Sequence, residues 1–556
     1  MFIRLLVPLA VTAVLGIPGA ALAQPDAKEL NEPTLYELLL GEIALQRGDN
    51  ALAAKTYLEL ARRTGDARVA RRAVEVANQA KLPELALEAA KTWQEIEPES
   101  PAALQVVAAL LVSAKRIDEA EPYLEKLLSA KGIDLERGFL QLNRLLAGNP
   151  DKAANLRVVR QLAAAHPQIA SAHLAVAQAS AAASDDAQAL AAARRAAQLR
   201  PEWEAPAVLE AQVLQKRSTS DAAKRLAQFV EKNPNSREGR LNYARALVLD
   251  KRVPEARKQF ESLLAANPGN TDLIYTVGLL AFQLKDYPVA EDNMKRLVDN
   301  ANYRDPDGAR FMLGQIAEEQ KQWPRAVEWY QQIQDGEHAL PARLRTANAI
   351  AKQGKLDAAR DFLHKVSADN PGAEVQLTVA EAQLLRDANR HREAFELLGG
   401  ALKAEPEQPE LLYDFALTAE KLEKFDLLEQ NLRKLIEVRP DHAHAYNALG
   451  YSFAERNTRL PEARDLIEKA LELAPEDYFI VDSLGWVQYR QGDLKGAAET
   501  LRRAWGGRPD AEIGAHLGEV LWVLGDRGEA NRIWQESLKS APDNETLLKT
   551  IKRLRR

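Results

Sequence analysis

The residues of this chain that could do catalytic or metal chemistry are its histidines and its carboxylates. Among the eight histidines, only His442 and His444 lie close together, and a spacing of two residues directs them to different sides of a helix. Pairs of carboxylates close in sequence do not indicate a catalytic site, because 80 Asp and Glu residues produce such pairs by chance. The chain has no catalytic-serine, zinc-protease, phosphate-loop or dinucleotide motif, and without a cysteine it lacks a thiol nucleophile. The sequence therefore predicts no enzyme, no cofactor, no metal site and no small-molecule substrate. A catalytic site hidden between structural units is the alternative.

One stripe of side chains has the composition of a protein-binding surface. Phe479, Asp482, Trp486, Tyr489 and Arg490 follow one another at spacings of 3, 4, 3 and 1, which places them on one face of a helix. The opposite face carries the apolar residues that packing requires. Aromatic residues beside arginine on a surface that packing does not require are typical of an interaction hot spot. The predicted partner-binding residues are His444, Asn447, Tyr451, Phe479, Asp482, Trp486, Tyr489, Arg490 and Trp522.

The same stripe also has a structural interpretation, in which Trp486 and Tyr489 pack between adjacent helices. Stability separates the two interpretations, because a buried tryptophan is costly to remove whereas a ligand-facing one is not. For a weaker stripe further upstream, packing between neighbouring units is the favoured interpretation. That stripe consists of Tyr275, Leu279, Phe282 and Phe311.

The helices that carry these stripes belong to a repeated pattern. Leu484-Gly485 is followed twelve residues after the glycine by Ala497, then by Leu501 and Pro509. Alanines equivalent to Ala497 recur at intervals of 33 to 36 residues, and two intervals of 69 each contain one degenerate unit, around Asn155 and Leu428. These alanines are Ala53, Ala86, Ala120, Ala189, Ala222, Ala256, Ala290, Ala326, Ala359, Ala394, Ala463, Ala497 and Ala530.

Each position of the pattern has a physical role in a pair of packed helices. Gly485 lacks a side chain, which lets the second helix approach the first, and Ala497 does the same from the second helix. A bulky residue such as Leu501 is expected to fill the gap between units. Proline stops the second helix and presets the turn to the next unit. The unit-ending prolines are Pro167, Pro201, Pro234, Pro268, Pro371, Pro406, Pro440, Pro475, Pro509 and Pro542.

This pattern resembles the tetratricopeptide (TPR) repeat, and about fifteen copies fill residues 33 to 542. One such unit cannot bury its apolar face alone, so neighbours must stack. The resemblance implies an all-α fold, a right-handed TPR superhelix (α-solenoid) of helical hairpins whose first helices line a concave inner face. The turn-rich segment 299–308 predicts a joint between an N-terminal TPR arc (33–302) and a C-terminal TPR arc (303–542). Residues 543–556 are predicted to form a C-terminal capping helix with a basic end.

The first 23 residues are expected to be a cleaved signal peptide. Arg4 precedes an apolar run from Leu5 to Leu15, and Ala21-Leu22-Ala23 has the small-x-small pattern of a cleavage site. The run is too short to span a bilayer comfortably, which favours a cleaved signal peptide. An uncleaved membrane anchor is the alternative. The mature chain is then expected to begin at Gln24, with a linker over residues 24–32.

The expected destination is the periplasm of a Gram-negative bacterium. Because the chain has no cysteine, it forms no disulfides and is not expected to be a lipoprotein, so membrane association is peripheral or absent. The formal net charge of −6 argues against nucleic-acid binding. Only residues 549–556 are locally basic, and a solvated helix end is favoured there over a recruitment motif.

Two segments, residues 34–80 and 445–505, carry a narrower resemblance. They are similar to a family of long exported TPR proteins of Gram-negative bacteria, the LbcA-type adaptors of a periplasmic carboxyl-terminal processing protease. That resemblance implies a non-catalytic scaffold that wraps the protease, activates it and brings it cell-wall hydrolases to degrade. Those adaptors are lipoproteins, whereas this chain has no cysteine. The alternative is a TPR scaffold for envelope assembly or for polysaccharide synthesis and export machinery.

Overall fold

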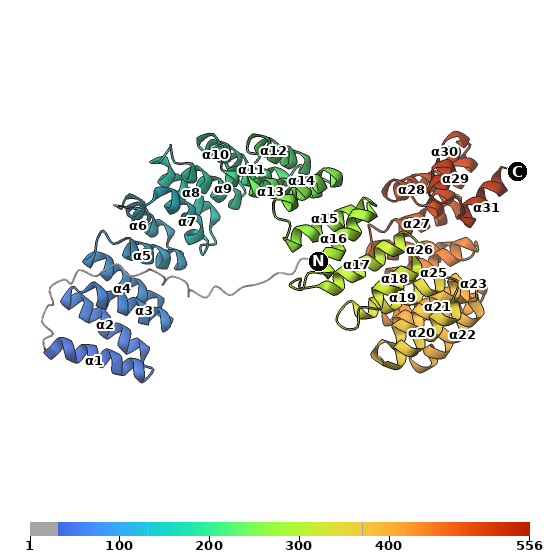
Figure 1. The fold of residues 1–556 in the computed structure, drawn as a ribbon, viewed down its shortest axis with the longest axis horizontal. Helices are drawn as coiled ribbons and strands as arrows, with labels where there is room; N and C mark the ends of the chain where they lie inside the picture. Colours follow the sequence, from blue (N-terminus) through green and yellow to red (C-terminus); the bar gives the residue numbers. More distant parts are fainter. Residues whose placement is uncertain (1–31, 131, 370, 556) are drawn as a thin grey trace. The chain divides into compact units, whose positions relative to one another are not determined.

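The computed structural model describes residues 32–130, 132–369 and 371–555. Over these residues the chain forms 31 α-helices and one 3₁₀ helix and has no strand, so the predicted all-α class is confirmed. The predicted signal peptide (1–23) and the linker up to residue 31 lie outside the described residues. The helices form two compact units, one ending at Asn267 and the other beginning at Pro268, which can be followed by colour in Figure 1.

The helices of the first unit are α1 (Glu32–Gln46), α2 (Asn50–Thr64), α3 (Ala67–Gln79), α4 (Pro83–Ile96), α5 (Pro101–Ser113), α6 (Ile117–Ser129), α7 (Leu135–Leu146), α8 (Lys152–Ala164), α9 (Ala170–Ala182), α10 (Asp186–Leu199), α11 (Glu204–Gln215), α12 (Thr219–Lys232), α13 (Arg237–Leu249) and α14 (Val253–Ala266).

Those of the second unit are α15 (Thr271–Gln283), α16 (Tyr287–Val298), α17 (Pro306–Glu319), α18 (Trp323–Tyr330), α19 (Ala339–Lys352), α20 (Leu356–Asp369), η1 (Pro371–Ala373), α21 (Glu374–Asp387), α22 (His391–Ala404), α23 (Pro409–Lys421), α24 (Phe425–Val438), α25 (Ala443–Glu455), α26 (Leu460–Leu473), α27 (Tyr478–Arg490), α28 (Leu494–Gly507), α29 (Ala511–Leu524), α30 (Arg527–Ser540) and α31 (Glu545–Leu554).

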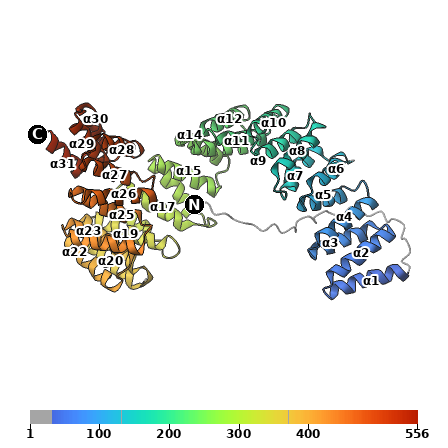
Figure 2. The same ribbon diagram turned by 180° about the vertical axis from the view of Figure 1, so that it is seen from behind.

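In the described part of the chain, α1 to α30 succeed one another as fifteen hairpins, and α31 follows as a single helix. Seen from either side, consecutive hairpins stack within each unit (Figures 1 and 2). The fifteen hairpins agree with the predicted fifteen repeats, and the two degenerate units contain Asn155 on α8 and Leu428 on α24. The pair α7–α8 departs from the rule, because α7 packs mainly on α9 rather than on α8.

The interior of the hairpins follows from the glycine positions. An added Cβ at Gly485 of α27 would lie only 2.6 Å from the Cγ of Leu501 on α28, and one at Gly518 of α29 would collide with the indole of Trp534 on α30. Leu501 thus fills space inside its own hairpin, and it also belongs to a buried cluster with Ala511 and Ala515 of the next hairpin. Proline ends the second helices as predicted; α28, for example, ends at Gly507, two residues before Pro509.

We expect Gly518→Ala to lower the free energy of unfolding by about 1–3 kcal/mol, the usual cost of overpacking a core. The indole of Trp534 is fully buried and has no open space into which it could retreat. Gly400→Ala is the matched control, because nothing lies within 4 Å of a Cβ added there; it is expected to stabilise α22 by about 0.5–1 kcal/mol. Urea unfolding followed by circular dichroism measures both changes, and equal effects at the two positions would contradict the packing argument.

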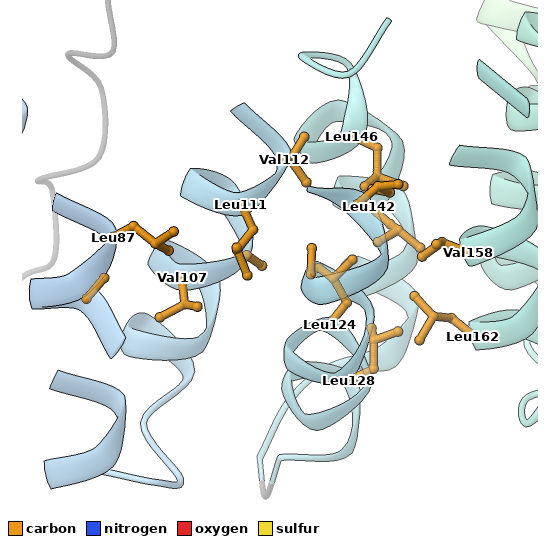
Figure 3. Packing of buried hydrophobic residues seen from close by; sticks show 14 of the residues in the cluster. Leu87, Val107, Leu111, Val112, Leu124, Leu128, Leu142, Leu146, Val158 and Leu162 are labelled. Atoms are coloured by element: carbon orange, nitrogen blue, oxygen red, sulfur yellow. The ribbon is translucent and has the colours of Figure 1, made fainter. Parts of the chain in front are cut away.

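Buried aliphatic side chains run from hairpin to hairpin in the first unit. Figure 3 shows Leu87 of α4, Leu111 of α5, Leu124 of α6, Leu142 of α7 and Val158 of α8, all buried in one continuous cluster across successive helices. Each helix therefore depends on its neighbours, as expected for stacked repeats. No helix in the described range combines the length and the apolar composition required to span a bilayer.

The segment predicted as a joint, residues 299–308, lies inside the second unit. The Tyr303 N–H donates to the Asn300 carbonyl at 2.9 Å, and Asp305 accepts from the Gly308 N–H at 2.9 Å, which caps α17. These bonds hold the longer loop in place, and α16 packs directly on α17. The division between the units comes one hairpin earlier, at Asn267, rather than at the predicted boundary of 302/303.

Candidate partner-binding face

The nine predicted partner-binding residues lie on the first helices of three successive hairpins, α25, α27 and α29. Among the hairpins that carry these residues, α25 packs on α27 and α27 on α29, and α31 continues this layer after α29. The second helices of neighbouring hairpins do not pack on one another to a similar extent. The first helices thus form the tighter layer, and we call its solvent-facing surface the first-helix face.

Trp486 lies within this layer and not on its surface. Its side chain is only 4% exposed, its Nε1–H donates to Oε2 of Glu455 at 2.8 Å, and its ring stacks on that of His516 with centroids 4.3 Å apart. Arg490 donates to the Glu455 carbonyl at 3.2 Å. The expectation that packing does not require Trp486 was therefore wrong, and the alternative, packing between adjacent helices, describes its position.

Asp482 is buried as well, because it pairs with a histidine one repeat further along the chain. Nδ1 of His516 lies 2.8 Å from Oδ2 of Asp482, and both side chains are about nine-tenths buried. Burial lowers the pKa of His516, but the charge and hydrogen bond of Asp482, with smaller contributions from Glu455 and Glu512, outweigh it and hold the pKa above its ordinary value. The imidazole ring also stacks on Trp486, which covers it from α27.

His516 was not predicted from the sequence as part of this stripe, although its spacing from Asp482 indicates that it belongs there. It follows Asp482 by 34 residues, the length of one repeat, and therefore falls on the same stripe of the next first helix. Tyr489 has an equivalent partner one repeat later: its hydroxyl donates to Oε1 of Glu519 at 3.2 Å. Burial raises the pKa of Tyr489, and the nearby Glu519 carboxylate adds to the effect.

Tyr451 lies close to His516. Its hydroxyl lies 3.5 Å from Nε2 of His516. Burial raises the pKa of Tyr451 well above its ordinary value, and the charges of Glu455, Asp482, Glu512 and Glu420 raise it further. Glu455 and Glu512 are exposed to solvent, Glu420 is partly exposed and Asp482 is buried.

Of the four remaining predicted residues, Asn447 of α25 is half-buried, and the other three are Phe479, His444 and Trp522. Phe479 is exposed, with the guanidinium of Arg508 4.6 Å above its ring, and His444 is also exposed. Trp522 is half-buried and packs beside Trp534, with centroids 5.5 Å apart. The structure therefore brings the residues around Tyr451 and Trp486 together and leaves these three apart from them.

The described side chains of this region do not form a metal-binding group. Over the described residues there is no group of three or more His, Asp or Glu side chains that could hold a metal ion. His442 acts instead as a helix cap, since its Nδ1 accepts from the Ala445 N–H at 3.1 Å. Burial lowers the pKa of His442, which favours the neutral form that this acceptor role needs.

A second surface, which sequence reasoning missed, lies on α1. Four large apolar side chains are exposed there: Leu35 by 48%, Tyr36 by 67%, Leu39 by 52% and Ile43 by 44%. The signal was present in the sequence, because α1 reads EPTLYELLLGEIALQ and is apolar around most of its circumference. The end of a stacked-repeat protein normally carries a polar outer face, so this apolar stripe is unusual.

The opposite end of the chain is closed by α31. Leu547 of this helix is buried against the last hairpin, Arg553 pairs with the buried carboxylate of Glu519, and Arg555 donates to Oδ1 of Asn531. Arg553 and Arg555 remain exposed to solvent, so this is a solvated helix end as expected, and the two arginines also contact their neighbours.

Comparison with known proteins places these hairpins in a family. The tetratricopeptide repeat model matches residues 213–271, 275–341 and 413–478. A TPR repeat-containing protein of Pseudomonas aeruginosa is 35% identical over 527 residues, which cover 94% of this chain and 88% of that protein. Cellulose synthase operon protein C of Pseudomonas fluorescens is 24% identical over 337 residues, 59% of this chain and 24% of that protein.

Solved TPR structures are also similar to parts of the chain. A thermophilic TPR protein of Thermus thermophilus is 24% identical over 32% of this chain and 98% of its own, with a TM-score of 0.30. A tetratricopeptide repeat protein of Parabacteroides merdae is 15% identical over 45% of this chain and 99% of its own, with a TM-score of 0.36. The extent of the match to the Pseudomonas aeruginosa protein shows that this chain belongs to the tetratricopeptide repeat family.

Proposed function

We propose that this protein is a non-catalytic adaptor that binds and activates a carboxyl-terminal processing protease and brings it cell-wall hydrolases. TPR repeats form scaffolds for protein–protein interaction, and the resemblance of residues 34–80 and 445–505 to LbcA-type adaptors supports the protease as partner. An adaptor must hold two proteins. The chain offers two candidate surfaces, the apolar stripe of α1 in the first unit and the first-helix face in the second.

The exposed stripe of α1 is the observation that carries the proposal. Leu35, Leu39 and Ile43 follow one another at intervals of four residues, so their side chains share one side of the helix. Contiguous exposed apolar surface of this kind marks a protein contact, and i, i+4 anchors are how a helix enters the hydrophobic groove of a partner. We propose that α1 is one of the two contacts of the adaptor.

We propose the periplasm as the location, on the strength of the signal-like first 23 residues and the absence of cysteine. A chain that is exported and cleaved has Gln24 as its first residue. N-terminal sequencing of the chain recovered from periplasmic extract decides this, and an intact Met1 would count against the proposal.

A scaffold for polysaccharide synthesis or export is the second candidate function. It is favoured by the similarity to cellulose synthase operon protein C, which extends over 59% of this chain. The resemblance of residues 34–80 and 445–505 to LbcA-type adaptors includes segments from both units, and for this reason we place the adaptor first. Co-purification of synthase or export components in place of a protease would favour the second candidate.

Reconstitution tests the adaptor proposal. With the host's processing protease and a cell-wall hydrolase, we expect faster cleavage of the hydrolase when this protein is present. Leu39→Lys should abolish the stimulation, because loss of a hot-spot anchor costs about 2 kcal/mol or more, roughly thirtyfold in Kd. Leu249→Lys, at a leucine of similar exposure on α13, is the matched control and should leave the stimulation intact. Unchanged cleavage together with no complex by size exclusion would overturn the proposal.

A further inference from the structure

We propose that α1 pairs with α1 of a second copy of this chain, in an antiparallel contact centred on Leu39. The inference goes beyond the proposed function, because it concerns the chain on its own and requires no protease. Three observations carry it: the place of the apolar stripe in the repeat, the symmetry of the stripe, and the charges at its two ends.

The apolar stripe of α1 occupies positions that stacking covers in other hairpins. Val487 of α27 and Val520 of α29 each lie two residues after the glycine of their hairpin. Both are fully buried, in clusters that include side chains of the preceding hairpin. Ile43 holds the same position, two residues after Gly41, but the structure describes no helix before α1 and Ile43 is exposed. The stripe is therefore a stacking surface that the described part of the chain leaves uncovered.

The stripe is symmetric about Leu39. Leu35 precedes Leu39 by four residues, and Ile43 follows it by four. A second α1 that runs antiparallel, with the two Leu39 side chains together, therefore brings each Leu35 against Ile43 of the other copy. Residues four apart form the ridges that interlock in the commonest class of helix packing, in which the axes cross at about −50°. A contact that matches itself in this way is what a twofold dimer requires.

The two ends of α1 carry opposite charges that fit the same arrangement. Glu32 lies in the first turn, and Arg47 directly follows the last residue of the helix. Both are exposed, and neither side chain forms an ion pair with another described residue, whereas Glu37 is already paired with Arg63. The antiparallel alignment places Arg47 of each copy beside the start of the other α1, where Glu32 lies. The unpaired charges of α1 thus complement those of a second copy.

The contact is expected to be reversible. A single helix of 15 residues offers much less than the roughly 800 Å² per partner that standard interfaces bury, so dimers should separate on dilution. Separation also frees the stripe for the partner of the adaptor, because a paired α1 cannot enter the groove of another protein. The two contacts therefore exclude one another.

Sedimentation velocity of the full chain over a range of concentrations, with no other protein present, tests the pairing. We expect an exchange between monomer and dimer. Leu39→Lys should weaken the dimer by roughly thirtyfold or more, because it places two like charges at the centre of an apolar contact. Leu249→Lys, at a leucine of similar exposure on α13, is the matched control. A chain that stays monomeric, or a dimer that tolerates Leu39→Lys, would overturn the proposal.

A charge exchange tests the antiparallel register. Glu32→Lys and Arg47→Glu should each weaken the dimer by about two- to fivefold, the range of exposed ion pairs. The double variant reverses both charges and should recover the affinity of the native chain, since each lysine then faces a glutamate of the other copy. A double variant weaker than either single variant would rule out this register.

Disulfide trapping gives a third readout, because the chain has no cysteine of its own. Leu39 lies opposite itself in the dimer, so Leu39→Cys should form a covalent dimer on oxidation, whereas Leu249→Cys should remain monomeric; equal trapping of both variants would contradict the contact. None of these measurements contains a protease. A failed reconstitution would therefore leave the dimer standing, and a monomeric chain would leave the adaptor function standing.

Discussion

Replacing Trp486 by alanine is expected to lower the free energy of unfolding by about 3–5 kcal/mol, the usual cost of deleting a buried aromatic side chain. The indole is almost fully buried, stacks on His516 and donates its N–H to Glu455. Its removal opens a cavity between α25, α27 and α29 and leaves the buried imidazole without its aromatic partner. Urea unfolding of the full chain, followed by circular dichroism and by tryptophan fluorescence, measures the loss.

Phe479→Ala is the matched control on the same helix. Phe479 is exposed and interacts mainly with the guanidinium of Arg508, so its loss should cost only about 0.5–1 kcal/mol, typical of an exposed cation–π pair. If Trp486→Ala left the unfolding midpoint unchanged, the residue would face a ligand, as the sequence pattern first indicated, and the packing described above would be wrong. Equal losses at the two positions would equally contradict the difference in burial.

The hairpins could be predicted from the sequence because their rules are local. A glycine where the two helices approach and a proline after the second helix act within one repeat, and their spacing is directly visible in the chain. The close approach of α28 to α27 at Gly485 and the helix end before Pro509 are examples that the structure bears out. The same local rule allowed the degenerate units around Asn155 and Leu428 to be located from spacing alone.

The burial of the side chains in the stripe on α27 could not be predicted from the sequence, because it depends on how successive first helices pack. The helical spacing placed Asp482 and Trp486 on one side of α27 correctly. It could not reveal that His516 of α29 and Tyr451 of α25 would cover that side from both neighbours. The contact between Tyr451 and His516 joins residues 65 positions apart, which no single repeat encodes. The exposed stripe of α1 was missed for a related reason. The sequence of an apolar first helix does not show whether other helices cover it.

Replacing His516 by glutamine is expected to destabilise the second unit by about 3–5 kcal/mol at acidic pH, the cost of breaking a buried charge pair by removing one partner. Asp482 lies within hydrogen-bonding distance of His516, and its charge, with those of Glu455 and Glu512, raises the pKa of the imidazole against the effect of burial, so we expect the pair to be charged at acidic pH. Glutamine can still donate a hydrogen bond but carries no charge. Asp482 then remains buried without a cation.

The effect should depend on pH in a defined direction. The folded chain holds the pKa of His516 above its ordinary value, which is about 6.5 in an unfolded chain. A raised pKa contributes stability that is fully present below the unfolded value and is lost as the pH rises through the folded value. The stability difference between the native chain and His516→Gln is therefore largest below about pH 6.5 and shrinks above it. Unfolding midpoints measured across this range in a fixed salt concentration give the difference directly.

His444→Gln supplies the control for this titration. His444 lies on α25, two first helices before α29, and its side chain is 56% exposed and 3.8 Å from Asp477, so its removal should leave the pH dependence of unfolding nearly unchanged. A stability difference for His516→Gln that stays constant from acidic to alkaline pH would show that the imidazole is neutral in the fold. In that case the aromatic stack with Trp486, and not the charge of the pair with Asp482, would account for its contribution.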